Sequence, residues 1–318
     1  MKKIILIIIL GLSITSILNA QTTAIKDTLW RKGGIISVNF NQVSLSNWAA
    51  GGDNALALNT LVSVFANYKH KKIAWDNNLD LAYGIIKQGD QNMQKNEDKI
   101  DLTSKIGYDA YKGKWYYTFL FNFKSQFAKG YAYPNDSTIV SQFGAPAYVL
   151  GSIGMDYKPN DKFSLFISPL TAKFTIVNDQ NLADAGSYGV DPAEYDALGN
   201  KIKDGKTLRA EFGAYLNAKF QKEIITNVNL MTKLELFSNY ADNPQNVDVN
   251  WQVLLAMKVN KYISASVYTQ LIYDDNTPVP LYEGSGLNKT VAGFGPRTQF
   301  KEVLGIGLSY KFNSYSGN

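Results

Sequence analysis

Apolar and polar residues alternate along this chain over stretches much longer than the strands of ordinary globular proteins, which have about five to six residues. In segment 73–85, Trp75 and Tyr83 share one face of an extended chain, whereas Asp76 and Asp80 share the other. Segment 114–128 repeats the pattern with aromatic residues on one face. No helix places such sets on opposite faces. The chain is therefore predicted to be all-β.

Twelve segments carry this alternation, and their connections alternate in length. Connections after the even-numbered segments are short and usually carry lysine, whereas the others are longer. This arrangement predicts a twelve-stranded antiparallel up-and-down transmembrane β-barrel over residues 34–312, with the tight turns and both termini on the periplasmic side. The segments are 34–43, 55–69, 72–87, 98–112, 114–128, 147–158, 162–177, 206–221, 223–239, 246–260, 262–274 and 300–312.

A soluble β-sandwich is the main alternative, because its strands also alternate between an inner and an outer face. The length of the alternation and the charges deep within the polar face both favour the barrel. A barrel lumen can solvate or pair such charges while the apolar face meets lipid. The charges are those of Asp76, Asp80, Asp101, Lys105, Asp109, Lys124, Arg209, Glu211, Lys219, Lys233, Glu235 and Lys258.

Aromatic residues cluster near the predicted strand ends, as in the two aromatic girdles of transmembrane barrels. The periplasmic girdle is predicted to contain Tyr68, Trp75, Trp115, Phe163, Phe220, Tyr262 and Phe312. The outer girdle is predicted to contain Tyr83, Phe127, Tyr148, Phe174, Phe237, Trp251 and Tyr273.

The N-terminus combines two lysines, an apolar run and a small residue at Ala20, which predicts a secretory signal peptide over residues 1–20. The alternative is an anchor helix, but the apolar run is shorter than the ~20 residues of a membrane span. Residues 21–33 would then be a periplasmic segment, and residues 313–318 a C-terminal tail. Without Lys2 and Lys3 the chain has 30 basic and 27 acidic residues, and a net charge of +3 does not suggest nucleic acid.

Catalytic chemistry is limited by composition, because the chain has no cysteine and one histidine. Thiolate metal sites, disulfides and His-rich sites are excluded. His70 lies in a predicted tight turn between two lysines, where a solvated turn residue is favoured over a general base. We therefore predict no enzyme, cofactor or metal, with an enzyme of non-histidine chemistry as the remaining alternative.

Three connections could bind a ligand, a metal ion or a partner. For the first two, a purely structural role as a turn or a solvated loop is favoured. Loop 48–54 contains Trp48 and two glycines, which suit a turn more readily than a ligand platform. Loop 178–205 is acidic but lacks the regular ligand spacing of an EF-hand, so a solvated loop is favoured over a calcium site. Loop 275–299 is rich in proline and glycine and could form a plug or dock a partner.

Proline interrupts one predicted strand at Ser168-Pro169. Because proline cannot donate a ladder hydrogen bond, a β-bulge is predicted there. The apolar parity changes across it, from Ile167 before it to Leu170 after it.

The C-terminal segment resembles the signal by which bacterial barrel-assembly machinery selects its substrates. Gly307, Tyr310 and Phe312 carry the likeness. The sequence departs from the pattern because a short tail follows Phe312 and Gly305 replaces a usual polar residue. This resemblance implies the assembly machinery and outer-membrane lipid as partners.

The mature chain is similar to an uncharacterised outer-membrane barrel family of Bacteroidetes-type bacteria, a domain of unknown function. The strings NFNQVSLSNWAAGG at 39–52, SPLT at 168–171 and GPRTQFKE at 295–302 carry the resemblance. It implies a barrel in the outer membrane of a Gram-negative bacterium but no activity. A small channel for polar or charged solutes is the first functional hypothesis, and a non-conducting component that binds an unidentified outer-membrane partner is the alternative.

Facing charges predict a register for segments 206–221 and 223–239. A three-residue turn at 221–223 would place Arg209 opposite Glu235 and Glu211 opposite Lys233. Opposite charges at facing positions stabilise a strand pair, and like charges destabilise it. We therefore expect these two pairs to brace the wall and narrow the lumen.

Overall fold

The computed structural model describes residues 29–44, 54–133, 135–260, 263–283 and 290–313. The predicted signal peptide, residues 48–53 of loop 48–54, Tyr262 and residues 314–318 of the tail lie outside these residues. None of the helices within them is long and apolar enough to cross a membrane.

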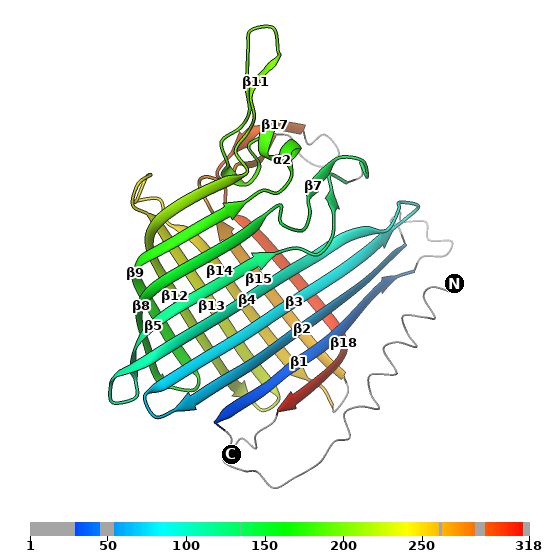
Figure 1. Ribbon diagram of the computed structural model, residues 1–318. Coiled ribbons are helices and arrows are strands. Elements are labelled where there is room, and N and C mark those ends of the chain that lie inside the picture. The colour runs from blue at the N-terminus through cyan, green and yellow to red at the C-terminus, as the bar shows by residue number, and fades with distance from the viewer. Residues whose placement is uncertain (1–28, 45–53, 134, 261–262, 284–289, 314–318) are drawn as a thin grey trace.

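Twelve antiparallel strands form a closed barrel, which confirms the predicted fold class (Figure 1). Around the barrel the order is β1-β18-β15-β14-β13-β12-β9-β8-β5-β4-β3-β2. The strands are β1 (Trp30–Val43), β2 (Ala55–His70), β3 (Ile73–Gln88), β4 (Gln94–Tyr111), β5 (Trp115–Ser125), β8 (Ala147–Asn160), β9 (Phe163–Ile176), β12 (Leu208–Ile225), β13 (Val228–Asn239), β14 (Asp248–Lys258), β15 (Ile263–Tyr273) and β18 (Gln299–Asn313).

The first strand begins earlier than predicted. Trp30 to Gly33 pair with Tyr68 to Phe65 of β2, so they belong to the barrel and not to the preceding 21–33 segment. The sequence did not indicate this extension, because Arg31 and Lys32 are charged, two glycines follow them, and the alternation of apolar residues begins only at Ile35.

Connections of two kinds meet at opposite ends of the barrel. At the end that we call the hairpin end, left-handed residues such as Lys71, Gly113 and Asn227 form tight turns, with φ of 50°, 66° and 65°. At the loop end lie the short elements β6 (Gly130–Tyr131), β7 (Ile139–Ser141), α2 (Gln180–Asp184), η2 (Ser187–Gly189), β10 (Glu194–Tyr195), β11 (Lys201–Lys203), β16 (Val279–Glu283) and β17 (Thr290–Gly295) (Figure 1).

The loop end has a small apolar core of its own. Leu182 and Ala183 of α2 pack with Ala145, Val177 and Val190. The Asp179 side chain accepts hydrogen bonds from the first turn of α2, which caps its N-terminus. This core fixes loop 178–205 at its base, from which the β10–β11 hairpin projects (Figure 1).

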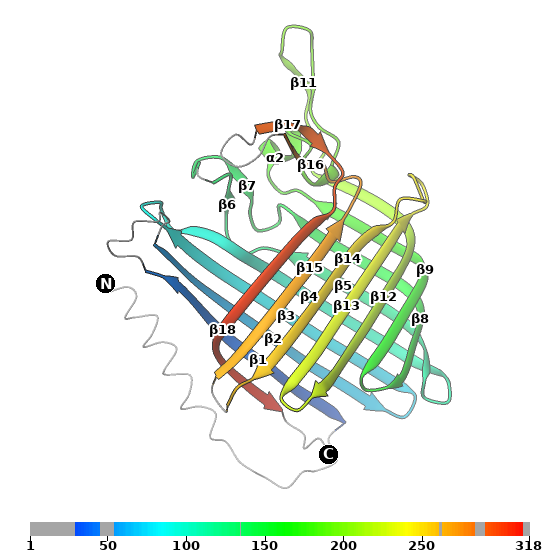
Figure 2. The same cartoon turned by 180° about the vertical axis from the view of Figure 1, so that it is seen from behind.

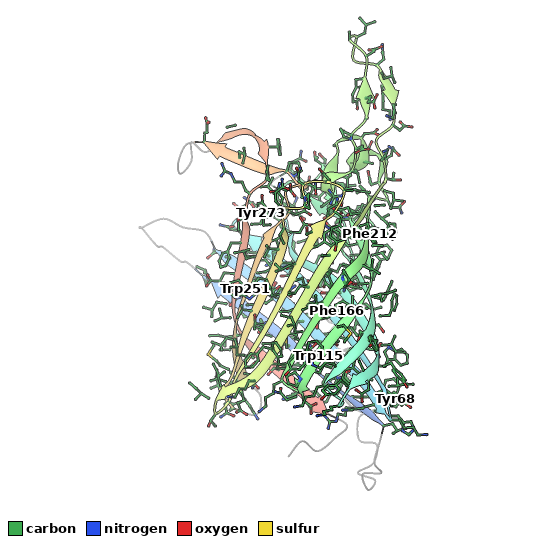
Figure 3. The ribbon with its side chains drawn as sticks, turned by 90° about the vertical axis from the view of Figure 1, so that its left-hand side faces the viewer. Tyr68, Trp115, Phe166, Phe212, Trp251 and Tyr273 are labelled. Atoms are coloured by element: carbon green, nitrogen blue, oxygen red, sulfur yellow. The ribbon has the colours of Figure 1, made fainter. Side chains whose placement is uncertain are left out.

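The barrel wall is apolar outside and polar inside. Outward side chains such as Ile106, Ile153, Leu170 and Leu304 are 47% to 61% exposed, whereas Asp101, a charged residue of β4, is 1% exposed. A soluble protein would show the opposite arrangement. Aromatic residues lie toward both ends, with Tyr68 and Trp115 near the hairpin end and Tyr273 near the loop end (Figure 3).

The predicted bulge at Ser168-Pro169 is confirmed. The ladder between β9 and β12 shifts where Thr171 pairs with Gly213 and Ser168 pairs with Tyr215. The Ser168 hydroxyl donates to the Ile153 carbonyl at 2.7 Å, which satisfies an acceptor of β8 beside the bulge.

Closure of the barrel depends on a short seam between its first and last strands. Gly33 to Asn39 of β1 pair with Asn313 to Gly307 of β18, which is seven pairs. Along its other edge β1 pairs with β2 over fourteen residues. Toward the loop end the two strands diverge (Figure 2). Within the part of the chain that the structure describes, residues 40–43 of β1 form no ladder pairs with β18.

A disulfide scan should locate the end of this seam. Val38 and Leu308 face each other on the outer surface, and directly opposed antiparallel residues lie within disulfide range. We expect a cysteine pair at these positions to crosslink under mild oxidation. A matched pair at Phe40 and Ile306, one step further along the same face, should not. The chain has no native cysteine, so any disulfide must join the two introduced cysteines. Equal crosslinking of both pairs would show that the ladder continues.

Candidate functional site

The predicted register of β12 and β13 is wrong. Asn217 faces Glu235 and Lys219 faces Lys233, because β12 continues to Ile225 and the turn lies four residues later than predicted. Arg209 and Glu211 lie beyond the end of the β12–β13 ladder. The inward parity of the four predicted residues is nevertheless correct.

Arg209 and Glu211 instead pair with each other near the loop end. The Arg209 guanidinium lies 2.9 Å from a Glu211 carboxylate oxygen, and Lys173 of the adjacent strand β9 lies 3.4 Å from the same carboxylate. Arg209 also donates to the Gly189 carbonyl of η2 at 3.3 Å. This contact ties the loop-end core to the barrel wall.

Glu235 and Lys233 belong to a group of ion pairs that we call the mid-lumen network. Glu235 accepts from Lys124 at 2.7 Å and lies 3.2 Å from Lys233. Lys233 lies 3.4 Å from Asp101, and Lys99 lies 3.8 Å from the same carboxylate. The network comprises Lys99, Asp101, Lys124, Lys233 and Glu235.

This network spans the lumen and does not run along one wall. Four strands separate β4, which carries Asp101, from β13, which carries Lys233. Lys99 also donates to Gln252 of β14 at 3.2 Å, and β14 lies diametrically opposite β4. Facing lysines on β12 and β13 are tolerated because partners across the lumen supply their counter-charges and acceptors.

An apolar cluster fills the lumen beside the network, and the sequence analysis missed it. One residue comes from each of five consecutive strands, β5, β8, β9, β12 and β13, and each is at most 8% exposed. The cluster consists of Leu120, Leu150, Phe166, Tyr215 and Phe237. These five residues share the inward parity of the charged residues on their strands, and this parity was the sequence signal that could have identified the cluster.

Two residues of the predicted outer aromatic girdle, Phe237 and Tyr148, face the lumen and not the lipid. Phe237 points into the lumen, where the Lys173 ammonium lies 4.8 Å from its ring centroid. Tyr148 also faces the lumen and lines the cavity described below. Neither belongs to an outer girdle, because each shares the parity of inward residues on its strand.

A second network lies inside the lumen nearer the hairpin end, along the wall formed by strands β3 to β8. Asp156 of β8 lies 2.9 Å from Lys105 of β4 and 3.1 Å from Lys158, which also pairs with Asp76 of β3. Ser164 donates to Asp156 at 2.9 Å. We call Asp76, Lys105, Asp156 and Lys158 the hairpin-end network.

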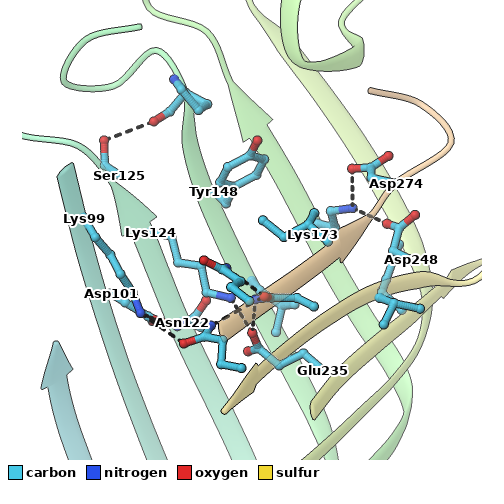
Figure 4. A pocket seen from close by; sticks show the side chains of 18 of the residues that line it. Lys99, Asp101, Asn122, Lys124, Ser125, Tyr148, Lys173, Glu235, Asp248 and Asp274 are labelled. Atoms are coloured by element: carbon cyan, nitrogen blue, oxygen red, sulfur yellow. Dashed lines mark hydrogen bonds and ion pairs between the residues drawn. The ribbon is translucent and has the colours of Figure 1, made fainter. Parts of the chain in front are cut away.

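Above the mid-lumen network, toward the loop end, lies a cavity of about 330 Å³ that we call the vestibule. Figure 4 shows Lys99, Asp101 and Lys124 on one side and Asp248 and Asp274 on the other. Its further lining includes Glu97, Tyr148, Leu150, Lys173, Glu235, Phe237, Asn250, Gln252, Gln270, Ile272 and Lys301.

Acidic residues gather at two places, but neither makes a metal centre by itself. Asp248, Asp274 and Asp275 have ligand atoms within 4.8 Å of one another, and Lys173 lies 2.6 Å from Asp248. In loop 178–205, Lys201 pairs with Asp184 and Asp204, both at 2.7 Å. Hydrogen bonds from Lys201 and Gln180 lower the pKa of Asp184 to about 2. These lysine partners suit the favoured interpretation of a solvated, ion-paired loop.

The remaining predicted residues lie in strands of the barrel. His70 is the exposed last residue of β2, at the hairpin end. Gly307 pairs with Asn39 in the seam, and a Cβ there would lie 2.1 Å from the Val38 carbonyl oxygen, so the close approach requires glycine. Tyr310 and Phe312 stack with ring centroids 6.3 Å apart.

Residues 40–131 match the model of a family described as "Protein of unknown function (DUF3078)". The match includes most of the string at 39–52 but neither 168–171 nor 295–302, so the resemblance to a family of unknown function is confirmed for this part of the chain. No curated protein matches the chain.

Solved barrels resemble the chain along most of its length but with little identity. The translocator domain of the autotransporter NalP from Neisseria meningitidis is 12% identical, with 94% of this chain and 92% of that one covered and a TM-score of 0.36. An outer membrane channel from Pseudomonas putida F1 is 10% identical, with 92% and 98% covered and a TM-score of 0.38. Such values transfer no function to this chain.

Proposed function

We propose that the protein resides in the outer membrane of a Gram-negative bacterium. The closed barrel with its apolar exterior and charged interior supports this location, since only closed barrels and helices satisfy every backbone group in lipid. The loop end would face outward and the hairpin end the periplasm. Export by a signal peptide at 1–20 and an origin in Bacteroidetes-type bacteria stay predictions.

Within that membrane, the protein acts as a narrow channel for small polar or charged solutes that is closed at rest. One observation carries this proposal, namely that a vestibule with charged residues in its lining ends on ion pairs that cross the lumen. Solutes would collect in the vestibule and pass when the mid-lumen network rearranges. Six carboxylates and four lysines line the vestibule, so we expect a preference for cations.

The same filled lumen favours a second candidate, a non-conducting component of an outer-membrane complex. Asp101, Asp156 and Phe166 are at most 1% exposed, as in a barrel closed by its own side chains. In this role the protein would bind an outer-membrane partner through its loop end. That the protein is not an enzyme stays a prediction under either proposal.

Planar-bilayer recording distinguishes the two candidates. A channel closed at rest should give infrequent single-channel current steps with a cation preference. These steps are expected for either orientation of the barrel in the bilayer. Insertion is verified separately by the heat-modifiable mobility of the recovered protein. Complete absence of steps from verified insertions, under voltage ramps and across salts, would contradict the channel and leave the non-conducting component.

A further inference from the structure

The two sides of the vestibule carry different charges. On one side, Glu211, Asp248 and Asp274 carry three negative charges against the positive charges of Lys173 and Arg209 (Figure 4). On the other side, the mid-lumen network has three lysines against two carboxylates. Glu97 and Asp98 also line the cavity, but they pair with Lys301 and Lys95. A solute in the cavity therefore lies between a wall with excess negative charge and a wall with excess positive charge.

An accessible and incompletely neutralised charge on each side identifies where a solute would bind. Lys99 is 26% exposed, and its closest carboxylate oxygen, on Asp101, is 3.8 Å away, which is longer than a charged hydrogen bond. Asp248 and Asp274 are 16% and 15% exposed, and they share the ammonium of Lys173 at 2.6 and 3.9 Å. Arg209 lies 4.0 Å from Asp274 and is also paired with Glu211. One lysine and one carboxylate equivalent are thus incompletely neutralised on opposite sides.

The surface between these charges is mixed. Leu150, Phe237 and Ile272 provide apolar lining, and Gln270 provides an amide. The Tyr148 hydroxyl points into the cavity (Figure 4) and has no hydrogen-bond partner among the residues that the structure describes. A hydroxyl that faces a cavity with no protein partner is available to a ligand or to water.

We propose that the vestibule binds a zwitterionic solute, an amino acid or short peptide with an apolar side chain. Its carboxylate pairs with Lys99, its ammonium group lies against Asp248 and Asp274, and its side chain contacts Leu150 and Phe237. This inference rests on the proposed function, because it names the solute class of the same lumen. An ion of one sign would satisfy only one of the two walls.

Binding of leucyl-leucine to the purified, folded barrel in detergent tests the proposal by calorimetry. The free dipeptide should bind at least tenfold more tightly than its N-acetyl form or its C-terminal amide, since each modification removes one charge. Asp248→Asn should weaken the free dipeptide but leave the N-acetyl form unchanged. Lys99→Gln should weaken the free dipeptide but leave the amide unchanged. Asp204→Asn, on the projecting hairpin, is the matched control and should change nothing.

Equal binding of all three ligands, or no binding of the dipeptide to a folded barrel, would overturn the inference. So would substitutions that weaken the blocked and free ligands alike. Because binding is measured without current, its failure is separate from failure of the channel. A barrel that binds the dipeptide but never conducts would retain the site and lose the channel.

Discussion

Deletion of Tyr310 to Phe312 is expected to abolish assembly of the barrel. These residues pair with Ile36, Ile35 and Gly34 of β1, so the deletion removes three of the seven seam pairs. The exposed backbone groups of β1 would then lie in lipid, where each unsatisfied group costs several kcal/mol. Heat-modifiable mobility of the membrane fraction should be lost.

Removal of residues 314–318 is the control for this deletion and should leave assembly unchanged. Folding into lipid vesicles without cellular factors separates two causes. Failure in cells and vesicles alike indicates loss of closure, whereas failure in cells alone indicates loss of recognition by barrel-assembly machinery. Normal insertion of the longer deletion in cells would contradict both the seam and the assembly signal.

Asp156→Asn is expected to destabilise the folded barrel by about 3–5 kcal/mol, the usual cost of breaking a buried ion pair from one side. Asp156 is 0% exposed, and its loss leaves Lys105 and Lys158 without the carboxylate that they share. The free energy of unfolding in urea, measured from lipid vesicles, checks this expectation.

A matched aspartate at the surface serves as the control. Asp161 pairs with Arg31 at 2.7 Å, but the two side chains are 85% and 56% exposed. Asp161→Asn should therefore cost less than about 1 kcal/mol. Equal losses for the two variants would mean that the hairpin-end network contributes no more than a surface ion pair.

The architecture could be predicted from the sequence because a barrel wall imposes a period of two on every strand. Ile106 and Ile153 face outward and Asp101 and Asp156 face inward, as their parity requires. The short turns were equally legible, since Gly113 and the lysines beside it separate long alternating segments. Parity does not, however, report how far a strand continues beyond its last apolar residue.

The register of β12 and β13 could not be predicted for that reason. Residues 222–225, which follow the predicted strand, continue the β12 ladder before the chain turns at Asn227. Local charge pairing pointed to a different register because Lys233 and Glu235 find partners on β4 and β5. Those contacts join residues more than one hundred positions apart, and a single sequence does not reveal them.

The single-channel conductance of the Glu235→Gln variant tests most directly whether the mid-lumen network closes the lumen. Glu235 pairs with Lys124 and Lys233 in the mid-lumen network, so its neutralisation should release Lys124, leave Lys233 with Asp101 alone and widen the path below the vestibule. We expect conductance at least threefold above that of the native protein and a weaker cation preference. Glu194→Gln, an equivalent change in β10 at the loop end, should leave both unchanged. If Glu235→Gln conducts with the native amplitude and ion preference, the network does not close the lumen.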